Sequence, residues 1–148
     1  MKTKTFFISA LLMLAALAVL YFLASNYREF VGRQAFKETG LVPLSLEEAK
    51  ALSRKTNKPI LVEMSADWCG YCYKFHKEVL SDPRVFEKIN DRYVFSLVDF
   101  DEPSTSDFKH TYQLFQVPAM VIIDSEGMLI RRVKISYAPD LILRELEM

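Results

Sequence analysis

The chain has 148 residues, of which 51% are hydrophobic, and its 19 basic residues balance 19 acidic ones. That length suffices for one domain with a hydrophobic core and a further segment. The chain has zero net charge and no basic block, so the sequence does not indicate nucleic acid as a partner. Two cysteines form at most one internal disulfide, which excludes a scaffold held together by several disulfides.

Residues 1–25 have the composition of a signal anchor. A short basic head containing Lys2 and Lys4 precedes an almost unbroken apolar run from Phe6 to Ala24. About 20 apolar residues are enough to cross a bilayer as a helix. A cleaved signal peptide is the alternative, because Ala16-Leu17-Ala18 fits a cleavage site, although it lies inside the apolar run. We expect an uncleaved transmembrane helix in the inner (cytoplasmic) membrane.

The charges around this helix predict its orientation. By the positive-inside rule the basic head stays in the cytoplasm, and the rest of the chain faces the periplasm or the cell exterior. Arg28, Arg33 and Lys37 on the far side weaken the asymmetry.

Residues 26–43 are mixed and polar and contain Gly32, Gly40 and Pro43, so we expect a linker. In the alternative, three apolar residues of this segment pack on the following domain: Phe30, Val31 and Phe36.

Residues 44–148 predict a domain in which helices and strands alternate. Ser45 followed by Glu48 is a capping box, which predicts a helix that ends near Thr56. The apolar run at 60–64 predicts a buried strand.

Helical spacing of apolar residues predicts a second helix from Tyr71 to Leu80. Asp82 as a cap and Pro83 at the first helical position start a third helix. Residues 93–100 are rich in aromatic and β-branched residues and predict the next strand.

The C-terminal part predicts a helix over 107–115, an apolar strand over 119–123, a hairpin turn at 124–127 and a returning strand over 128–135. A last helix begins near Pro139. Three aromatic residues of the helix over 107–115 should face the core: Phe108, Tyr112 and Phe115.

This order of elements predicts an α/β fold, with a four-stranded mixed sheet flanked by helices on both faces. Strands separated by helices are expected to be parallel and to join by right-handed crossovers. The last two strands should form an antiparallel hairpin. The run at 60–64 fits a central strand, which is buried on both faces.

Both cysteines lie in one motif, Cys69-Gly70-Tyr71-Cys72, where the strand at 60–64 leads into a helix. At the start of a helix the free backbone N–H groups and the helix dipole favour a thiolate, the form that attacks disulfides. Cys72, one turn later, is close enough to form a disulfide with Cys69 and should be the more shielded sulfur.

The order of elements, with this motif at the head of the second helix, resembles the thioredoxin fold. Trp68-Cys69-Gly70-Tyr71-Cys72 is similar to the W-C-G-x-C motif of thioredoxins, and Val117-Pro118 falls where that family has its cis-proline. The string from Ser65 to Cys69, with Ser81-Asp82-Pro83-Arg84-Val85, resembles the C-terminal periplasmic domain of DsbD-type disulfide reductases and small exported SoxW-type thioredoxins. The resemblance covers residues 44–148.

The resemblance implies that Cys69 attacks and Cys72 resolves. Glu63, six residues before Cys69, falls where thioredoxins have a buried acid that helps to move the proton of the second cysteine. A carboxylate inside an apolar strand is desolvated, which suits proton exchange. The alternative is that Glu63 faces a solvated edge of the sheet.

Substrate docking is expected at the surface around the sulfurs, with core packing as the alternative for Trp68. The expected docking residues are Trp68, Gly70, Tyr71, Val117 and Pro118.

No metal and no cofactor are expected. The spacing of Cys69, Cys72, His76 and His110 is unlike the common zinc patterns, and covalent haem attachment needs a histidine directly after Cys72. His76 lies four residues after Cys72, where it would tune a sulfur, but we expect a plain surface histidine.

These features predict a membrane-anchored, extracytoplasmic thiol–disulfide oxidoreductase. It would reduce disulfide-containing exported proteins and receive electrons from a membrane donor of the DsbD kind. An oxidase or isomerase is the alternative, because Cys69-Gly70-Tyr71-Cys72 resembles the motif of bacterial disulfide isomerases and strong oxidases share Val117 before the cis-proline. A redox-inactive binding module that docks through Trp68 and Pro118 is a third interpretation.

Overall fold

The centre of the molecule is a four-stranded mixed sheet in the order β2-β1-β3-β4. The structure is a computed structural model that describes residues 2–147, and for residues 2–6 the backbone alone. The four strands are β1 (Ile60–Ser65), β2 (Val94–Asp99), β3 (Ala119–Ile123) and β4 (Leu129–Val133).

The direction of β3 differs from the prediction. β1 and β2 are parallel, as expected, but β3 runs antiparallel to β1, with Ala119 beside Met64 and Ile123 beside Ile60. The preceding helix α5 (Ser106–Tyr112) has seven residues and so spans about 10 Å. A parallel connection would have to carry the chain back along a whole strand, about 20 Å. The chain therefore enters β3 at the end of the sheet where β1 ends.

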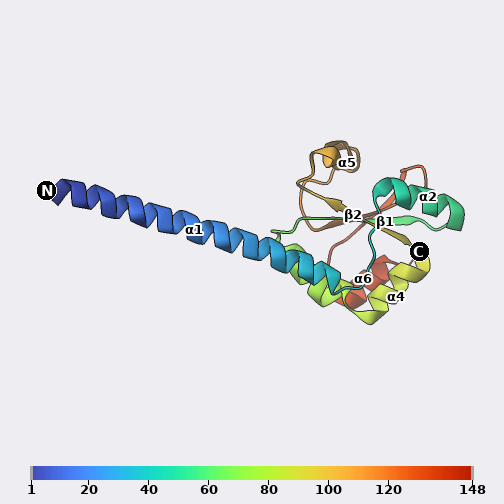
Figure 1. Ribbon diagram of the computed structural model, residues 1–148. Coiled ribbons are helices and arrows are strands. Elements are labelled where there is room, and N and C mark those ends of the chain that lie inside the picture. Colours follow the sequence, from blue (N-terminus) through green and yellow to red (C-terminus); the bar gives the residue numbers. More distant parts are fainter. Residues whose placement is uncertain (1, 148) are drawn as a thin grey trace.

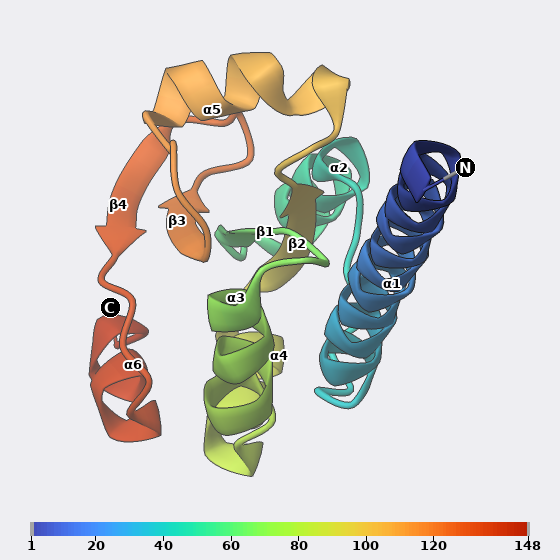
Figure 2. The same cartoon turned by 90° about the vertical axis from the view of Figure 1, so that its left-hand side faces the viewer.

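Helices cover both faces of the sheet, as predicted (Figures 1 and 2). One face packs against α2 (Leu46–Thr56) and α5, and the other against α3 (Gly70–Phe75), α4 (Pro83–Arg92) and α6 (Pro139–Glu145). A π-helical turn, His76–Leu80, continues α3, and a 3₁₀ turn, Pro103–Thr105, precedes α5. All residues of β1 and β3 are buried, as central strands require.

Local sequence signals set several helix starts. The predicted capping box of Ser45 and Glu48 is present at α2, and the Asp82 side chain caps α4, with Pro83 at its start. The side chains of Ser45 and Asp82 each accept a hydrogen bond from a backbone N–H that has no partner within the helix.

The end of α5 differs from the prediction. Gln113 adopts a left-handed conformation with φ 51°, so the helix ends at Tyr112. This turn points Leu114 into the core and leaves Phe115 62% exposed, so the prediction that Phe115 faces inward is wrong. Phe108 and Tyr112 are buried as expected.

The N-terminal helix α1 (Lys2–Lys37) is one uninterrupted helix of 36 residues. Its apolar part is long enough to cross a membrane and is not buried in the molecule. The helix leaves the domain as a free rod (Figure 1). The segment expected to be a linker thus continues the helix as far as Lys37. The division into segments 1–25, 26–43 and 44–148 stays a prediction.

The last part of α1 packs on the domain. Ala35 is buried, and the ring of Phe36 stacks on Phe95 at a centroid distance of 6.2 Å. Gly32 lies so close to the domain that a Cβ at this position would be 2.1 Å from the backbone oxygen of Asp67. The missing side chain of Gly32 therefore allows α1 to approach the backbone of Asp67 closely.

Candidate active site

Cys69 lies at the N-terminus of α3. The chain leaves β1, turns at residues 66–68 and enters the helix at Gly70, with Cys69 in the capping position. The backbone N–H of Cys72 donates a hydrogen bond to Cys69 Sγ over 3.1 Å. A sulfur that accepts this bond at the positive end of a helix is stabilised as a thiolate.

Cys72 is held as a neutral thiol. Both cysteines are free thiols, and Cys72 is 1% exposed. Burial and, to a smaller extent, the adjacent Cys69 sulfur raise the pKa of Cys72 to about 12. The Ser65 hydroxyl and the Ala66 backbone act in the opposite direction. The two sulfurs therefore differ in character, with Cys69 suited to attack and Cys72 to release a proton only during a later step.

The Val117-Pro118 peptide bond is cis, and it lies beside the first cysteine. The Cys69 thiol is 3.8 Å from the carbonyl oxygen of Val117, to which it donates. Val117 also packs against the small cluster formed by Ala66 and the two cysteines. The fold thus joins two loops that are 48 residues apart in the sequence.

Three candidate docking residues surround the sulfurs. Trp68 is 48% exposed, and its indole Nε1–H donates to the Asp101 carboxylate, so it is not simply a core residue. Tyr71 is 70% exposed. A Cβ at Gly70 would meet open space, so this position lies on the surface beside Cys69, which is itself 5% exposed.

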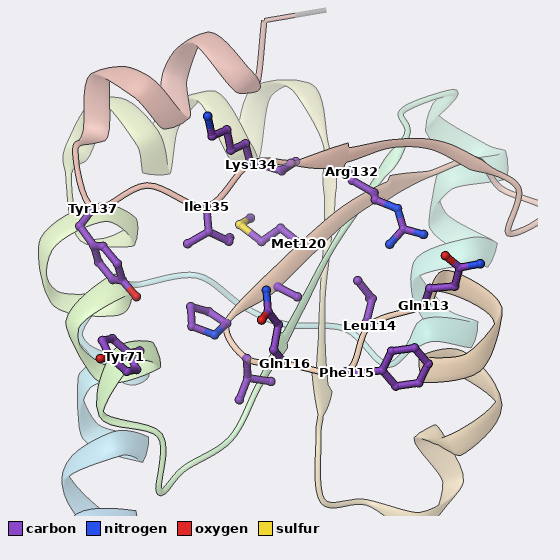
Figure 3. A pocket seen from close by; sticks show the side chains of 14 residues that line it. Tyr71, Gln113, Leu114, Phe115, Gln116, Met120, Arg132, Lys134, Ile135 and Tyr137 are labelled. Carbon is purple, nitrogen blue, oxygen red and sulfur yellow. The ribbon is translucent and has the colours of Figure 1, made fainter.

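A groove of about 740 Å³ extends from Tyr71 and Tyr137 past Pro118 towards β4 (Figure 3). Val117 and Pro118 are among its lining residues, and Phe115 lies at the end away from Tyr71 (Figure 3). Burial, with the nearby sulfurs of the motif, raises the pKa of Tyr137. The groove adjoins the motif at Tyr71.

Glu63 is completely buried, which rules out the alternative of a solvated edge. One carboxylate oxygen, Oε1, lies 2.7 Å from His76 Nε2. Among the described residues, Glu63 Oε2 and His76 Nδ1 are buried without a hydrogen-bond partner. No hydrogen bond in the described part of the chain joins Glu63 to either sulfur, so its proton role stays a proposal.

His76 is not the surface histidine that we predicted. It is 4% exposed, and its ring contacts Phe36 of α1 at 5.2 Å as well as Glu63. The spacing of four residues predicted that His76 shares a helix face with Cys72. Its burial was not predicted, because it depends on α1 covering this ring. His110 instead lies on α5 with its ring against Phe115. Across the described residues, the four candidate zinc ligands do not meet as a metal-binding group.

Sequence reasoning missed two residues of the site. Asp101 follows β2 and fixes Trp68, and Ser65 ends β1 next to Cys72. The sequence contained a signal for both residues: Ser65 directly follows one predicted strand and Asp101 directly follows the next. Parallel strands end at the same edge of the sheet, so both residues should lie near the motif.

The fold and the paired cysteines together define the class of protein. Residues 42–125, more than half of the chain, match the family model described as thioredoxin-like, and the chain belongs to that family.

Individual relatives narrow this assignment. The chain is 32% identical over 89 residues to the thiol:disulfide interchange protein DsbD 1 of Pseudomonas aeruginosa. That match covers 57% of this chain but only 15% of the relative.

Among solved structures, a thioredoxin from Thermus thermophilus is 27% identical with a TM-score of 0.64, over 72% of this chain and 84% of that one. The oxidised C-terminal domain of DsbD from Neisseria meningitidis shares the fold, with 23% identity and a TM-score of 0.53, over 67% of this chain and 85% of that one.

Proposed function

We propose that this protein is a membrane-anchored thiol–disulfide oxidoreductase that reduces disulfides of partner proteins outside the cytoplasm. The observation that carries the proposal is the unequal pair of sulfurs: Cys69 caps a helix N-terminus, while burial keeps Cys72 protonated. The interchange activity in the name of the Pseudomonas aeruginosa relative supports it.

The reaction follows from this arrangement. The Cys69 thiolate attacks a partner disulfide, so that a mixed disulfide forms and one partner sulfur leaves as a thiolate. Cys72 then loses its proton and attacks Cys69 Sγ, which releases the second partner sulfur. Two electrons pass to the partner, the proton of Cys72 balances one partner thiolate, the other partner thiolate takes a proton from water, and Cys69 and Cys72 end as a disulfide. In an oxidising compartment a membrane donor of the DsbD kind must reduce this disulfide again.

Trapping tests the order of attack. In the full-length chain, Cys72→Ser should leave the mixed disulfide with Cys69 unresolved, so exported partners remain covalently attached. Cys69→Ser is the matched control and should trap nothing. Absence of trapped partners in Cys72→Ser would contradict the mechanism.

We further propose that Glu63 accepts the proton of Cys72, with His76 holding the carboxylate in place. Glu63→Gln keeps the shape but removes the proton acceptor. It should slow the release of a partner from the mixed disulfide while leaving the initial attack by Cys69 unchanged. Stopped-flow measurement of both steps separates them, and an equal effect on both would count against this role.

The direction of electron flow depends on the reduction potential of the dithiol. Potentials range from about −270 mV for thioredoxin to about −120 mV for DsbA. Equilibration of the full-length protein with glutathione buffers should place Cys69 and Cys72 near the reducing end. A value near the oxidising end would favour the alternative of an oxidase or isomerase. Retained function after Cys69→Ser with Cys72→Ser would favour a binding module.

A further inference from the structure

Helix α1 forms one wall of a second groove, which ends at the reactive cysteine. This groove, of about 240 Å³, lies between the last part of α1 and the start of α3. It is separate from the groove over Pro118, although both adjoin the motif. The residues on its two walls are Tyr27, Arg28 and Val31 from α1 and Trp68, Cys69 and Gly70 from the motif.

Two contacts fix α1 in this position. Gly32 touches the backbone of Asp67, where any larger side chain would clash. Arg33 donates to the Asp67 carboxylate over 2.8 Å. Asp67 lies two residues before Cys69, so the helix is held directly against the loop that carries the nucleophile.

This packing sets the height of the sulfur above the membrane. The apolar run of α1 ends at Ala24, and the groove begins at Tyr27 and extends to Val31, three to seven residues later. At 1.5 Å per residue, the groove lies about 5–10 Å beyond the apolar segment. The headgroup layer on each side of a bilayer is about 5–8 Å thick. With the apolar run spanning a bilayer, the mouth of the groove would lie within or just above the headgroups.

The exposed rings around the motif fit this layer. Tyr27, Trp68 and Tyr71 are 68%, 48% and 70% exposed. Tyr and Trp are enriched where a membrane meets water, because one end of each side chain is apolar and the other polar. The start of α3 also lies on the side of the domain from which the free part of α1 leaves (Figure 1).

We propose that α1 holds the Cys69 thiol at the level of the lipid headgroups, where the groove takes a cysteine-bearing segment of a membrane-embedded partner. The proposal rests on the proposed anchor and thiol chemistry. It narrows the partners to proteins whose reactive sulfurs lie in the same layer. A disulfide high above the membrane is out of reach of a sulfur held so low.

Fluorescence quenching measures this height without any turnover. Full-length Cys72→Ser carries a bimane label on Cys69 and is placed in phosphatidylcholine vesicles in which some headgroups bear a nitroxide. The reference label is on Lys55→Cys, in a chain with Cys69→Ser and Cys72→Ser. Lys55 lies in the last turn of α2, at the end of the domain away from the free part of α1 (Figure 1).

We expect quenching at least about twofold stronger at Cys69 than at Lys55, because the headgroup layer is thin compared with the domain. Inserting 11 helical residues between Asn26 and Tyr27 adds about three turns and raises Cys69 by about 16 Å. Quenching should then fall to the level seen at Lys55. The same 11 residues added after Met148 are the control and should change nothing. Equal quenching at the two labels in the original chain would overturn the proposal.

A pair of lipid-linked probes tests the partner. A disulfide peptide is attached to a palmitoyl chain through either a short or a long Gly/Ser spacer. The Cys69 thiolate of Cys72→Ser displaces one sulfur, which leaves as a thiolate and takes a proton from water, while the other sulfur stays bonded to Cys69.

In the original chain, we expect mixed disulfides to form faster with the short spacer than with the long one. Once the insertion raises Cys69, the long spacer should give the faster reaction. A spacer preference that the insertion does not change would overturn the proposal. Strong headgroup quenching without any mixed disulfide would instead overturn the proposed thiol chemistry and support the height of Cys69. Mixed disulfides with soluble glutathione disulfide but no headgroup quenching would overturn this inference alone.

Discussion

Cys69 and Cys72 are separated by two residues and lie in one buried cluster, yet their sulfur atoms meet different groups. A backbone N–H points at Cys69 Sγ from the first turn of the helix, whereas Cys72 lies below that turn among buried atoms. One helical turn therefore separates a sulfur that accepts a backbone N–H bond from one that burial keeps as a neutral thiol.

Alkylation rates should show this difference. The pKa of Cys72 lies at about 12 instead of the ordinary 9.0, so at pH 8 its thiolate fraction falls about a thousandfold. We expect iodoacetamide to modify Cys69 and leave Cys72 almost unreacted in the reduced protein, as measured by peptide mass spectrometry. Unfolding in urea should make the two rates similar. Similar rates in the folded protein would contradict the assignment.

Glu63 and His76 form the second unusual pair at this scale. A carboxyl group completely inside the protein needs a partner, and His76 is the one that the fold supplies. The position of Glu63 in an apolar strand predicted its burial. Its partner was not predictable, because the burial of His76 depends on the contact of its ring with Phe36 of α1.

Replacing His76 should lower the stability of the fold, because it leaves the buried Glu63 carboxyl without a partner. His76→Ala removes the group that meets Glu63 Oε1, and we expect the free energy of unfolding to fall by about 1–3 kcal/mol. His110→Ala, at an exposed position on α5, is the control and should change it by less than about 0.5 kcal/mol. Urea unfolding measures both, and an unchanged value for His76→Ala would show that the pair does not stabilise the fold.

At the scale of elements, features set by a few neighbouring residues were predictable from the sequence. Features that depend on distant parts of the chain were not. Ser45 and Asp82 cap helices that begin where the sequence predicted. The direction of β3 and the end of α5 depend on how far a short helix can carry the chain and on one left-handed residue, Gln113. Gln113 carries no sequence signal for this conformation, which glycine or asparagine usually adopts at helix ends.

Two neighbouring substitutions test where α5 ends. Leu114 is buried, so Leu114→Ala should lower the free energy of unfolding by about 2–5 kcal/mol. Phe115 is exposed beside it, so Phe115→Ala should stay within about 0.5 kcal/mol. Thermal unfolding of the two variants compares them directly. The reverse order would restore the prediction that Phe115 faces the core.

At the scale of the whole molecule, the sheet brings together pieces that the sequence keeps apart. The edge where β1 and β2 end and β3 begins supplies Ser65, Asp101 and Pro118 around the motif. The motif and the proline were predictable from their likeness to thioredoxins. Asp101 and Ser65 were missed: the ends of their strands indicated this edge of the sheet, but the contacts that they make depend on the register of neighbouring strands.

Global stability should respond to the buried thiol. Between pH 9 and 12 the folded protein keeps a proton on Cys72 that the unfolded chain has lost, so the folded state binds more protons and its stability falls as pH rises. Reduced wild-type protein should therefore lose stability over this range relative to Cys72→Ser, whose hydroxyl does not titrate. Below pH 9 the difference should be constant. A difference that stays constant up to pH 12 would argue against the raised pKa.

The packing of α1 against the domain decides where a water-soluble version of this protein should begin. A shortened chain that starts at Leu44 lacks Phe36, so it uncovers Phe95 and the part of the His76 ring that Phe36 contacts. We expect it to self-associate in size-exclusion chromatography and to unfold at a lower temperature than a chain that starts at Ser25. Equal behaviour of the two would show that the packing contributes nothing. If the shorter chain is the less stable one, the last turns of α1 belong to the folded domain, while we propose that its first half lies in lipid.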